Sequence, residues 1–353
     1  MGEGLRIGVI GLGAIGGPVA ARLASTLPAG DELHLAAGSE ATATNLRTLG
    51  LTVELPGEVL TVPAARLALP KLSIDAQLPA VEGGYHVLLL CVRSEATHAA
   101  LLHAVPLLAR SGAIVCLQNG LPEEAAAAQA GAARTLGAVI GWSSTVDRPG
   151  HYRITGKGAF CLGAFKPEGE AQLEKCRALL ARAFPVKLTR NLVGARWGKL
   201  ALNCAISTLG AVSGLSFGEL AQRPLARRLA LRCIGEVVAV AHASFVELEP
   251  SSGLRAEWLD GLSRPWLNPL RGLLFRLAAA QRPTQRSGML ERLLAGRTSG
   301  QIDDLNGAVV RIAERLGVAV PVNRALLELV HAIERGEVKI GPENLAKAQA
   351  EKQ

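Results

Sequence analysis

Three polar side chains recur at four-residue intervals in one apolar segment of the chain: Lys199, Asn203 and Ser207. At about 3.6 residues per turn they share one face of a helix. The neighbouring residues are apolar and predict that much of this helix is buried: Leu200, Leu202, Ala205 and Ile206. A lysine in such surroundings is costly unless a ligand or partner group compensates for its desolvation. The segment is therefore compatible with a chemically active lysine or with one that extends to solvent at a domain edge.

A glycine-rich loop lies near the N-terminus, between an expected strand at Arg6–Ile10 and an expected helix that begins near Pro18. Its six residues are Gly11, Leu12, Gly13, Ala14, Ile15 and Gly16. In this context the first glycine allows a tight turn, the second lets a pyrophosphate approach the backbone, and the third allows close helix packing. The helix N-terminus then faces the phosphates. We therefore predict that these six residues bind a dinucleotide.

The end of the second expected strand, Glu32–Ala37, is where such a domain contacts the ribose of its dinucleotide. An acidic residue there favours NAD, whereas an arginine favours the phosphate of NADP. Glu40 lies just past the strand end, Ser39 is placed to contact a phosphate, and Arg47 lies further along the chain. The choice between the two cofactors stays open at this position.

Three further apolar runs, His86–Val92, Ala113–Leu117 and Leu136–Ile140, are typical of strands buried in a parallel sheet. Ligands bind at the carboxyl ends of such strands. Arg93 follows the first run and Asn119 follows the second, so we expect both residues at the edge that carries the glycine-rich loop. Asn119 is also compatible with an ordinary Asn-Gly turn.

The character of the chain changes near residue 189 and divides it into two expected domains. Residues 1–188 are expected to form an α/β, Rossmann-type dinucleotide-binding domain. Short strands over Trp142–Leu162 suggest an antiparallel edge, and a helix at about Glu168–Ala183 and a strand at Val186–Leu188 close this domain. Residues 189–353 are expected to form an all-helical substrate-binding and catalytic domain.

Apolar spacing in the second domain predicts helices at about Leu225–Val246 and from Ile302 to Leu316, where Gly317 stops the pattern. The interval Pro250–Gln285 contains three large aromatic residues in apolar segments: Trp258, Trp266 and Phe275. Two interpretations of this interval stay open, a lid over the site or additional core.

The composition excludes several classes of protein. Hydrophobic residues make up 49% and charged residues 19% of 353 residues, which is typical of a folded chain with more than one core. No apolar run is long enough to span a bilayer and no charged-then-apolar leader precedes the first strand, so we expect a cytoplasmic protein without a membrane partner. The cysteines form no C-x-x-C pair, and we expect neither a disulfide framework nor a metal site.

The formal net charge is +8, and much of the basic excess is arginine between Arg223 and Arg297. Solvated helix faces and a preference for anionic ligands are both compatible with this charge. No basic run is interleaved with aromatic residues, so we expect no nucleic-acid partner. The sequence leaves the oligomeric state open, and a homodimer is compatible with it.

Four motifs together resemble the ketopantoate reductase (2-dehydropantoate 2-reductase) family over nearly the whole chain. They are the glycine-rich loop, Leu117–Gly120, Trp197–Lys199 with Asn203, and Ile302–Gly307. The resemblance implies an NADPH-dependent reductase with a Rossmann domain and an all-helical domain. NADH is the alternative cofactor.

The resemblance also implies roles for individual residues. The catalytic lysine of the family matches Lys199, and its asparagines match Asn119 and Asn203. Asn119 is expected to contact the cofactor as well. A basic residue that the family uses near the NADPH phosphate matches Arg93.

Four positions depart from the family pattern where its members contact the substrate. Ser207 and Phe217 replace asparagines, Gly288 replaces a serine, and Gln301 replaces a glutamate. The pocket that recognises pantoate is therefore expected to be remodelled. The residues expected to contact the substrate are Lys199, Asn203, Ser207, Phe217, Gly288 and Gln301.

Three functions follow as hypotheses. The first is an NADPH-dependent reductase of a 2-oxo acid or a related small carbonyl compound. There, hydride reaches the carbonyl carbon and Lys199, with a pKa lowered by burial, supplies the proton to the forming alkoxide. The second is a reductase of a bulkier, less polar ketone or an imine. The third is a nucleotide-binding regulator without turnover, against which the intact Lys199–Asn203 pair argues.

Overall fold

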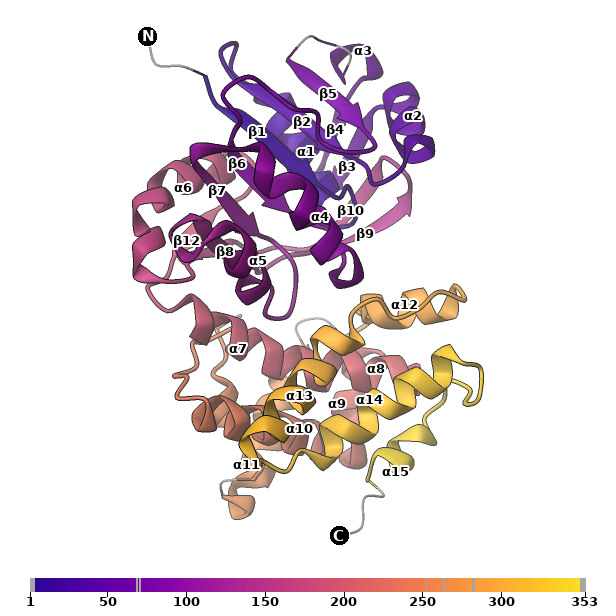
Figure 1. Cartoon of the computed structure of the whole chain (residues 1–353). Coiled ribbons are helices and arrows are strands. Elements are labelled where there is room, and N and C mark those ends of the chain that lie inside the picture. Colours follow the sequence, from indigo (N-terminus) through magenta and orange to yellow (C-terminus); the bar gives the residue numbers. More distant parts are fainter. Residues whose placement is uncertain are drawn as a thin grey trace. The chain divides into compact units, whose positions relative to one another are not determined.

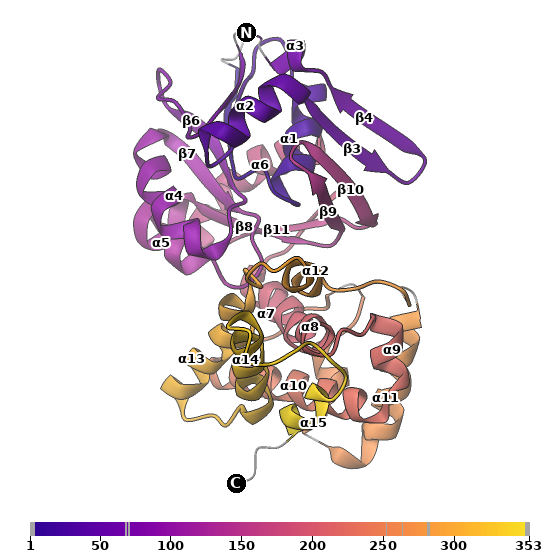
Figure 2. The same ribbon diagram turned by 90° about the vertical axis from the view of Figure 1, so that its right-hand side faces the viewer.

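The computed structural model describes residues 4–67, 69, 71–251, 253–262, 264–280 and 283–349. The chain divides into two compact units. Unit 1 comprises residues 1–118 and 122–192, and unit 2 comprises residues 119–121 and 193–353. Figures 1 and 2 show unit 1 as a mixture of strands and helices and unit 2 as helices joined by loops.

An eight-stranded sheet is the centre of unit 1 (Figure 1), with the strand order β12-β11-β8-β7-β6-β1-β2-β5. The strands are Arg6–Ile10 (β1), Glu32–Ala36 (β2), Leu72–Asp75 (β5), Tyr85–Leu90 (β6), Leu108–Cys116 (β7), Thr135–Ile140 (β8), Phe160–Ala164 (β11) and Val186–Leu188 (β12). All neighbouring strands are parallel except β8 and β11. The direction of strand progression reverses beside β1, where sheets of this kind bind their ligands.

Helices cover both faces of this sheet, which explains why its central strands are apolar without interruption. The helices α1 (Gly16–Ser25) and α6 (Leu173–Ala181) share a core with one face. The helices α4 (Thr97–Ala104) and α5 (Glu123–Ala130) share a core with the other face. Alternate side chains of β6 contribute to the two cores in turn. The predicted Rossmann-type architecture of the N-terminal part is confirmed.

A second sheet of four strands, in the order β4-β3-β10-β9, belongs to the same unit. Its strands are Leu51–Leu55 (β3), Glu58–Val62 (β4), Ser143–Arg148 (β9) and His151–Gly156 (β10). The short strands and antiparallel pairing predicted over Trp142–Leu162 are confirmed, since β9 and β10 form an antiparallel hairpin. The hairpin nevertheless belongs to the second sheet, because β10 also pairs with β3. Only β11 of that interval joins the main sheet as an antiparallel strand. The buried ring of Tyr152 packs against Gly17 of α1 and holds the second sheet there.

Unit 2 is built of helices around one apolar core, and its predicted helical character is confirmed. The helices are Leu192–Leu202 (α7, whose first residue is assigned to unit 1), Thr208–Ser213 (α8), Phe217–Gln222 (α9), Pro224–Ala243 (α10), Asn268–Ala280 (α11), Gly288–Leu294 (α12), Asn306–Leu316 (α13), Pro321–Glu334 (α14) and Asn344–Gln349 (α15). The helix α10 packs against α9, α11, α13, α14 and α15. The helix expected from residue 302 begins as a 3-10 turn, Ile302–Asp304, before α13.

A π-helical turn at Asn203–Ser207 joins α7 to α8. In a π turn each N–H bonds the carbonyl five residues earlier, so the 3.6-residue spacing assumed from the sequence does not hold between its two ends. The partly exposed residues of the segment still form one strip: Lys199, Leu202, Asn203, Ile206 and Ser207. The expected burial of Leu202 and Ile206 is thus only partial, because both border this strip, whereas Leu200 and Ala205 are fully buried.

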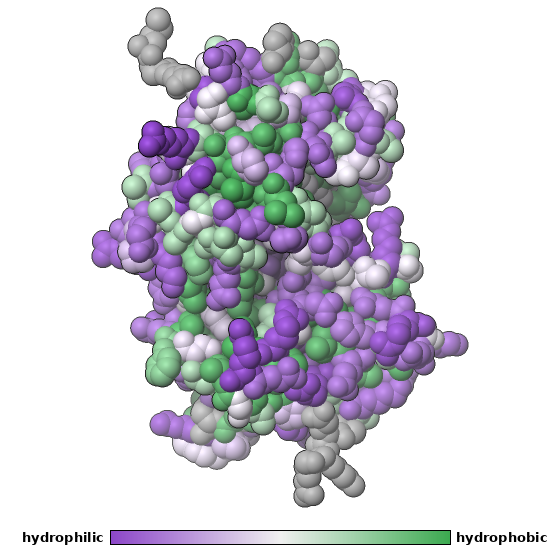
Figure 3. Space-filling view, viewed as in Figure 1, coloured by the Kyte–Doolittle hydropathy of each residue, from purple (hydrophilic) through white to green (hydrophobic). Residues whose placement is uncertain are grey.

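The face of the molecule in Figure 3 carries both hydrophilic and hydrophobic side chains. No helix within the described part of the chain is long and apolar enough to cross a membrane. The longest described helix, α10, has 20 residues and is interrupted by charged side chains.

Gly198 lets a later backbone segment lie directly against α7. A Cβ atom at this position would lie 2.1 Å from the carbonyl oxygen of Glu249. The amide of Glu249 also donates a hydrogen bond of 3.1 Å to the carbonyl oxygen of Gly194. Glycine beside Lys199 therefore allows this loop to cover one side of the helix.

We predict that Gly198→Ala destabilises the protein by about 1–3 kcal/mol, the usual cost of overpacking a close contact. Thermal unfolding followed by circular dichroism measures the change. Gly288→Ala is the matched control, because a Cβ atom at that helical position meets nothing within 4 Å. Equal melting temperatures for the two variants would contradict this packing constraint.

Candidate functional site

The three glycines of the glycine-rich loop meet three different requirements. Gly11 has a φ of 94°, which favours glycine, and a Cβ atom there would lie 2.9 Å from the amide nitrogen of Val92. A Cβ atom on Gly16 would lie 1.9 Å from the carbonyl oxygen of Gly11. On Gly13, by contrast, it would meet nothing within 4 Å. The loop is therefore tightly packed at both ends and open in the middle.

Two residues of the second sheet hold this loop, and sequence analysis did not identify either of them. The hydroxyl of Tyr152 donates a hydrogen bond of 2.8 Å to the carbonyl oxygen of Leu12. The hydroxyl of Ser144 donates to the carbonyl oxygen of Ala14. Both bonds join residues more than a hundred positions apart, so no local pattern indicates them. They fix the carbonyl groups of the loop on its side toward β9 and β10.

These features fit a bound dinucleotide. The open backbone at Gly13 forms a cradle that a side chain would fill, as the approach of a pyrophosphate requires. The N-terminus of α1, which no side chain caps, adds the positive end of a helix dipole that favours an anion. The glycine-rich loop is therefore the part of unit 1 that would hold the phosphates.

The end of β2 carries both acidic and basic groups. Ser39 caps α2 (Glu40–Leu49), and its Oγ accepts a hydrogen bond of 3.2 Å from the amide of Thr42. Arg47, in the last turn of this helix, pairs with Glu40 in its first turn. A second nitrogen of Arg47 lies 3.7 Å from Asp75 at the end of β5. Although Arg47 lies further along the sequence, its side chain is therefore at the end of β2, where it contacts the carboxylates of both Glu40 and Asp75.

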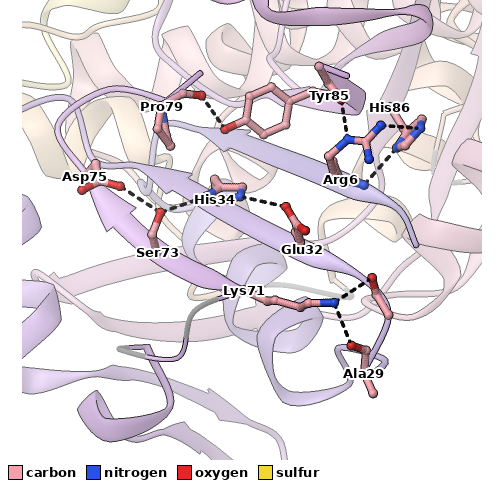
Figure 4. A network of polar contacts seen from close by, with 12 residues as sticks. Arg6, Ala29, Glu32, His34, Lys71, Ser73, Asp75, Pro79, Tyr85 and His86 are labelled. Atoms are coloured by element: carbon pink, nitrogen blue, oxygen red, sulfur yellow. Dashed lines mark hydrogen bonds and ion pairs between the residues drawn. The ribbon is translucent and has the colours of Figure 1, made fainter. Parts of the chain in front are cut away.

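A chain of polar contacts leads to Asp75 across neighbouring strands (Figure 4). His34 Nδ1 lies 3.0 Å from Ser73 Oγ, which donates a hydrogen bond of 2.8 Å to Asp75 Oδ2. His34 Nε2 lies 3.8 Å from Glu32, and burial lowers the pKa of this histidine despite the nearby carboxylate. These contacts orient Asp75 at the carboxyl edge of the sheet.

Arg93 follows β6 and precedes a short 3-10 turn, at the same edge of the sheet as the glycine-rich loop. Its side chain is about half exposed, and Nε lies 2.9 Å from a carboxylate oxygen of Glu95. An exposed arginine paired with a single surface carboxylate can exchange that partner at low cost. Arg93 is therefore available to an anionic group of a ligand.

Lys199 lies in the last turn of α7 and begins the partly exposed strip of unit 2. Burial of its ammonium group lowers the pKa to about 7, and the nearby charge of Arg196 contributes in the same direction. Desolvation and a like charge both disfavour the protonated form. Lys199 is thus poised to gain or lose a proton near neutral pH, which a proton donor requires.

A buried amide holds the π-turn that carries Asn203 and Ser207. Asn306 Nδ2 donates a hydrogen bond of 3.2 Å to the carbonyl oxygen of Cys204, inside the turn. Its Oδ1 accepts a bond of 2.7 Å from the hydroxyl of Thr208. A π-turn widens the helical ladder, and side-chain partners of this kind satisfy the groups that the widening displaces. Asn306, which sequence analysis quoted only as part of a motif, therefore positions this turn.

The network continues to a buried carboxylate. Asn306 Nδ2 also donates to Asn323 Oδ1 at 3.0 Å, and Asn323 Nδ2 donates to Glu236 Oε2 at 2.8 Å. The amides of Val322 and Asn323, at the start of α14, donate to Glu236 at 2.9 Å each. Desolvation raises the pKa of Glu236, although these hydrogen bonds act in the opposite direction. The carboxylate anchors the N-terminus of α14 to α10, and through Asn306 to the π-turn.

Two candidate residues that are far apart in the sequence meet in unit 2. Asn119 Nδ2 donates a hydrogen bond of 3.0 Å to Gln301 Oε1. The backbone beside them is close, since a Cβ atom on Gly120 would lie 2.9 Å from the carbonyl oxygen of Asp304. Asn119 therefore does more than form an Asn-Gly turn, because its side chain orients Gln301.

The remaining residues expected to contact the substrate are Phe217 and Gly288, which begin the short helices α9 and α12. The segment just before α12 lies against the start of α9. The amide of Phe217, the first residue of α9, donates a hydrogen bond of 3.0 Å to the carbonyl oxygen of Gln285. Three residues further on, Gly288 begins α12 after the capping Ser287. The helix α12 packs against α8 and the π-turn. Gly288 itself is exposed, with open space where a side chain would stand.

The predicted site residues thus form separate groups within the two units. Unit 1 holds the glycine-rich loop, Ser39 and Arg93. Unit 2 holds the strip of Lys199, Asn203 and Ser207, the Asn119–Gln301 pair, and the start of α12 against the π-turn. Among the described residues there is no group of three or more His, Cys, Asp or Glu side chains that would hold a metal ion.

Two domain models of one protein family match the chain. The model described as "Ketopantoate reductase PanE/ApbA" matches residues 7–167, and its C-terminal counterpart matches residues 191–334. A 2-dehydropantoate 2-reductase of Halobacterium salinarum is 27% identical over 340 residues, which cover 94% of this chain and 99% of that protein.

Solved structures show the same similarity over both units. A PanE/ApbA family ketopantoate reductase from Ralstonia eutropha JMP134 has a TM-score of 0.76 and 29% identity, covering 94% of this chain and 99% of its own. A D-mandelate dehydrogenase, in a ternary structure with NADH and anilino(oxo)acetate, has a TM-score of 0.78 and 21% identity with the same coverage. The second similarity is one of fold.

We predict that Gly13→Val abolishes dinucleotide binding, because the isopropyl group would occupy the open space that the pyrophosphate requires. We expect the variant to fold, since a Cβ atom at Gly13 meets nothing within 4 Å. Isothermal titration with NADPH and NADH measures the loss. Gly30→Val, at a turn before β2 where a Cβ atom meets only one atom at 3.8 Å, is the control. Retained affinity in Gly13→Val would exclude this loop as the phosphate site.

Proposed function

Because the chain belongs to the ketopantoate reductase family of NAD(P)H-dependent oxidoreductases that act on a carbonyl or CH–OH group, we propose that it reduces a 2-oxo acid with NADPH. The observation that carries this proposal is the lowered pKa of Lys199, about 7, on a strip shared with Asn203. A carbonyl reductase needs such a group to protonate the forming alkoxide.

The cofactor supplies the hydride for the carbonyl carbon when it is bound. The chain's own residues hold and protonate the reactants. The glycine-rich loop binds the pyrophosphate. Hydrogen bonds from Tyr152 and Ser144 to the carbonyl oxygens of Leu12 and Ala14 hold the loop in place. Lys199 donates one proton to the substrate oxygen as negative charge develops there, and solvent restores that proton. Asn203, held in place with the π-turn, orients the carbonyl group.

Asn119 and Gln301 act together in this proposal. The hydrogen bond between them fixes the Gln301 side chain, which stands where relatives carry a glutamate. A neutral amide at this position cannot form an ion pair with the protonated Lys199. The lysine therefore keeps the low pKa that burial imposes, because no carboxylate at this position offsets it.

NADPH is the preferred cofactor in this proposal, and NADH is the alternative. Arg93 and the exposed Ser39, whose hydroxyl bonds Thr42 in this structure, are the residues that we assign to the phosphate that distinguishes NADPH. Glu40 and Asp75 are placed to accept hydrogen bonds from the unmodified ribose of NADH, and both already pair with Arg47. Titration with the two cofactors compares these contributions, and equal or tighter binding of NADH would overturn the preference.

We predict that Lys199→Ala lowers the turnover number by about 10²–10⁴-fold, the range of a positioned acid–base group. The affinity for NADPH changes little, because the lysine faces the carbonyl group. Lys187→Ala, which removes an exposed lysine of β12, is the control. Near-normal turnover of Lys199→Ala would make the lysine structural, and no cofactor oxidation by the wild type with any carbonyl compound would favour a non-catalytic regulator.

The same proposal predicts the pH dependence of reduction. Below pH 7 Lys199 carries the proton that it donates, and above this pH it loses that proton. The turnover number therefore falls about tenfold per pH unit above pH 7. Lys199→Arg, whose side chain stays protonated, removes this descending limb even if its overall rate is low. A wild-type rate that is constant from pH 6 to pH 9 would contradict the role of Lys199.

The substrate is expected to be larger or more apolar than ketopantoate. Phe217 adds apolar surface, Gly288 leaves open space, and Gln301 is uncharged, so the polar partners for a small hydroxylated acid are reduced. Sites built to pair with a substrate hydroxyl discriminate strongly, because an unpaired buried polar group is costly.

We predict a kcat/KM for ketopantoate well below about 10⁴ M⁻¹s⁻¹, the lower end of the ordinary range. A panel of 2-oxo acids, ketones and imines, followed by the absorbance of NADPH, identifies the better substrate. Phe217→Asn and Gly288→Ser restore polar groups and raise the value for ketopantoate. Efficient reduction of ketopantoate by the wild type would overturn this specificity and leave the reductase function intact.

A further inference from the structure

The end of β2 lacks the side chain that usually selects between NADH and NADPH at this position of a dinucleotide-binding domain. The strand ends at Ala36, and Ala37 and Gly38 follow it. None of these three residues has a side chain that can form a hydrogen bond or pair with a charge. A dinucleotide held by the glycine-rich loop therefore needs its selecting group from a neighbouring element.

The neighbouring strand β5 supplies a carboxylate at this position. Asp75, its last residue, lies opposite Ala36 in the parallel pairing of the two strands. The carbonyl oxygen of Asp75 accepts a hydrogen bond of 2.8 Å from the amide of Ala37. Neighbouring strands are about 4.8 Å apart, so Asp75 is one strand spacing from the usual place of the selecting acid. Its side chain is 40% exposed, which leaves it open to a ligand.

Hydrogen bonds hold the Asp75 carboxylate in one orientation (Figure 4). Its Oδ2 accepts a hydrogen bond of 2.8 Å from Ser73 Oγ, two residues earlier on the same face of the strand. Ser73 Oγ in turn lies 3.0 Å from Nδ1 of the buried His34. The other carboxylate oxygen, Oδ1, lies 3.7 Å from Nη1 of Arg47. One oxygen is thus fixed by the strand, and the other contacts an arginine.

This arginine comes from the far end of α2. Side chains of a helix point toward its N-terminus, so Arg47 in the last turn extends back along α2 to Glu40 in the first turn. Its Nη2 also donates a hydrogen bond of 3.2 Å to Thr44 Oγ1. The arginine side chain is 42% exposed. Because exposed ion pairs contribute little stability, a ligand anion can replace the carboxylates as partners of this guanidinium.

The two charges of the Asp75–Arg47 pair favour different cofactors. NADPH carries a phosphate on its adenosine ribose, and an arginine recognises phosphate with two parallel hydrogen bonds. NADH carries a hydroxyl there, and a carboxylate accepts a hydrogen bond from it. A carboxylate without its arginine would repel the phosphate, and a guanidinium has no acceptor for the hydroxyl. Removal of either charge is therefore expected to change the ratio of the two affinities in a known direction.

We propose that Asp75 and Arg47 together set the ratio of the affinities for NADPH and NADH. Arg47 leaves the two carboxylates and pairs with the phosphate of NADPH, whereas Asp75 accepts a hydrogen bond from the ribose hydroxyl of NADH. This inference rests on the proposed cofactor-dependent function and adds a selecting pair from α2 and β5 to Arg93 and Ser39. Ser73 is a positioning residue, because its hydroxyl fixes one oxygen of the Asp75 carboxylate.

Isothermal titration of the full chain with NADPH and with NADH tests the proposal without any substrate. We expect Arg47→Leu to bind NADPH about 10–100-fold more weakly, the loss of a charge-assisted hydrogen bond, and NADH equally or more tightly. Arg177→Leu is the matched control, because this arginine of α6 pairs with Glu174 and its side chain is 41% exposed. A control that changes the ratio as much as Arg47→Leu would overturn the proposal, because net charge alone would then explain the effect.

Asp75→Asn tests the other half of the pair. We expect it to bind NADH about tenfold more weakly, because a neutral acceptor forms a weaker hydrogen bond than a charged one, and NADPH more tightly. Ser73→Ala weakens the binding of NADH and leaves that of NADPH unchanged. A merely structural role of Ser73 would lower the melting temperature without changing the ratio, and this result would contradict its positioning role.

Two results separate this inference from the proposed function. A ratio of dissociation constants that neither Arg47→Leu nor Asp75→Asn changes would overturn the inference and leave the reductase function intact. Binding of neither cofactor by the wild type would overturn both. Melting curves show whether the variants fold, and if Arg47→Leu does not, Arg47→Lys takes its place. This variant keeps the charge without the two parallel N–H groups, so we expect weaker binding of NADPH only, and an unchanged ratio would contradict the role of Arg47.

Discussion

The desolvation of one ammonium group, that of Lys199, is the constraint on which the arrangement of unit 2 depends. Burial lowers its pKa to about 7, so the folded chain holds this group in an unfavourable position. Close packing and hydrogen bonds hold the backbone on both sides of Lys199. The absence of a side chain at Gly198 lets a loop pack against α7, and Asn306 donates a hydrogen bond to the carbonyl oxygen of Cys204 in the π-turn. Because the network reaches the buried carboxylate of Glu236, the strip around Lys199 is tied to α10 and α14.

In unit 1 the important feature is open space at the glycine-rich loop, in contrast to the close packing around Lys199 in unit 2. The loop is closed by steric contacts at Gly11 and Gly16 and left without a neighbour at Gly13. Hydrogen bonds from Tyr152 and Ser144 engage two of its carbonyl groups on one side. A loop that is already held in its binding conformation loses little conformational entropy when it binds a phosphate. In the proposed function the second sheet thereby supports the phosphate-binding loop, although none of its residues is expected to touch the cofactor.

Features that depend on neighbouring residues were predictable from the sequence, and those that depend on distant pairing were not. The strand, loop and helix around Gly13 follow from local patterns, as does the helical character of unit 2. The pairing of β10 with β3 and the hydrogen bonds of Tyr152 join segments far apart in the chain. The contact of Asn119 with Gln301 spans 182 positions, and although Asn119 was expected from its place after a strand, only the family resemblance indicated Gln301. Apolar periodicity also could not show that Phe275 is in the core while Trp266 is 74% exposed, because it predicts an apolar side without indicating what covers it.

The account depends most directly on the protonation of Lys199, and its pKa can be measured without any substrate. Nuclear magnetic resonance of the full chain with ¹³C-labelled lysine follows the Cε signal of each lysine through a pH titration. Loss of one signal in Lys199→Arg assigns it. The account predicts that this signal titrates near pH 7, well below the value of about 10.4 that is ordinary for a lysine side chain in water. A Lys199 signal that titrates near the ordinary value would contradict it.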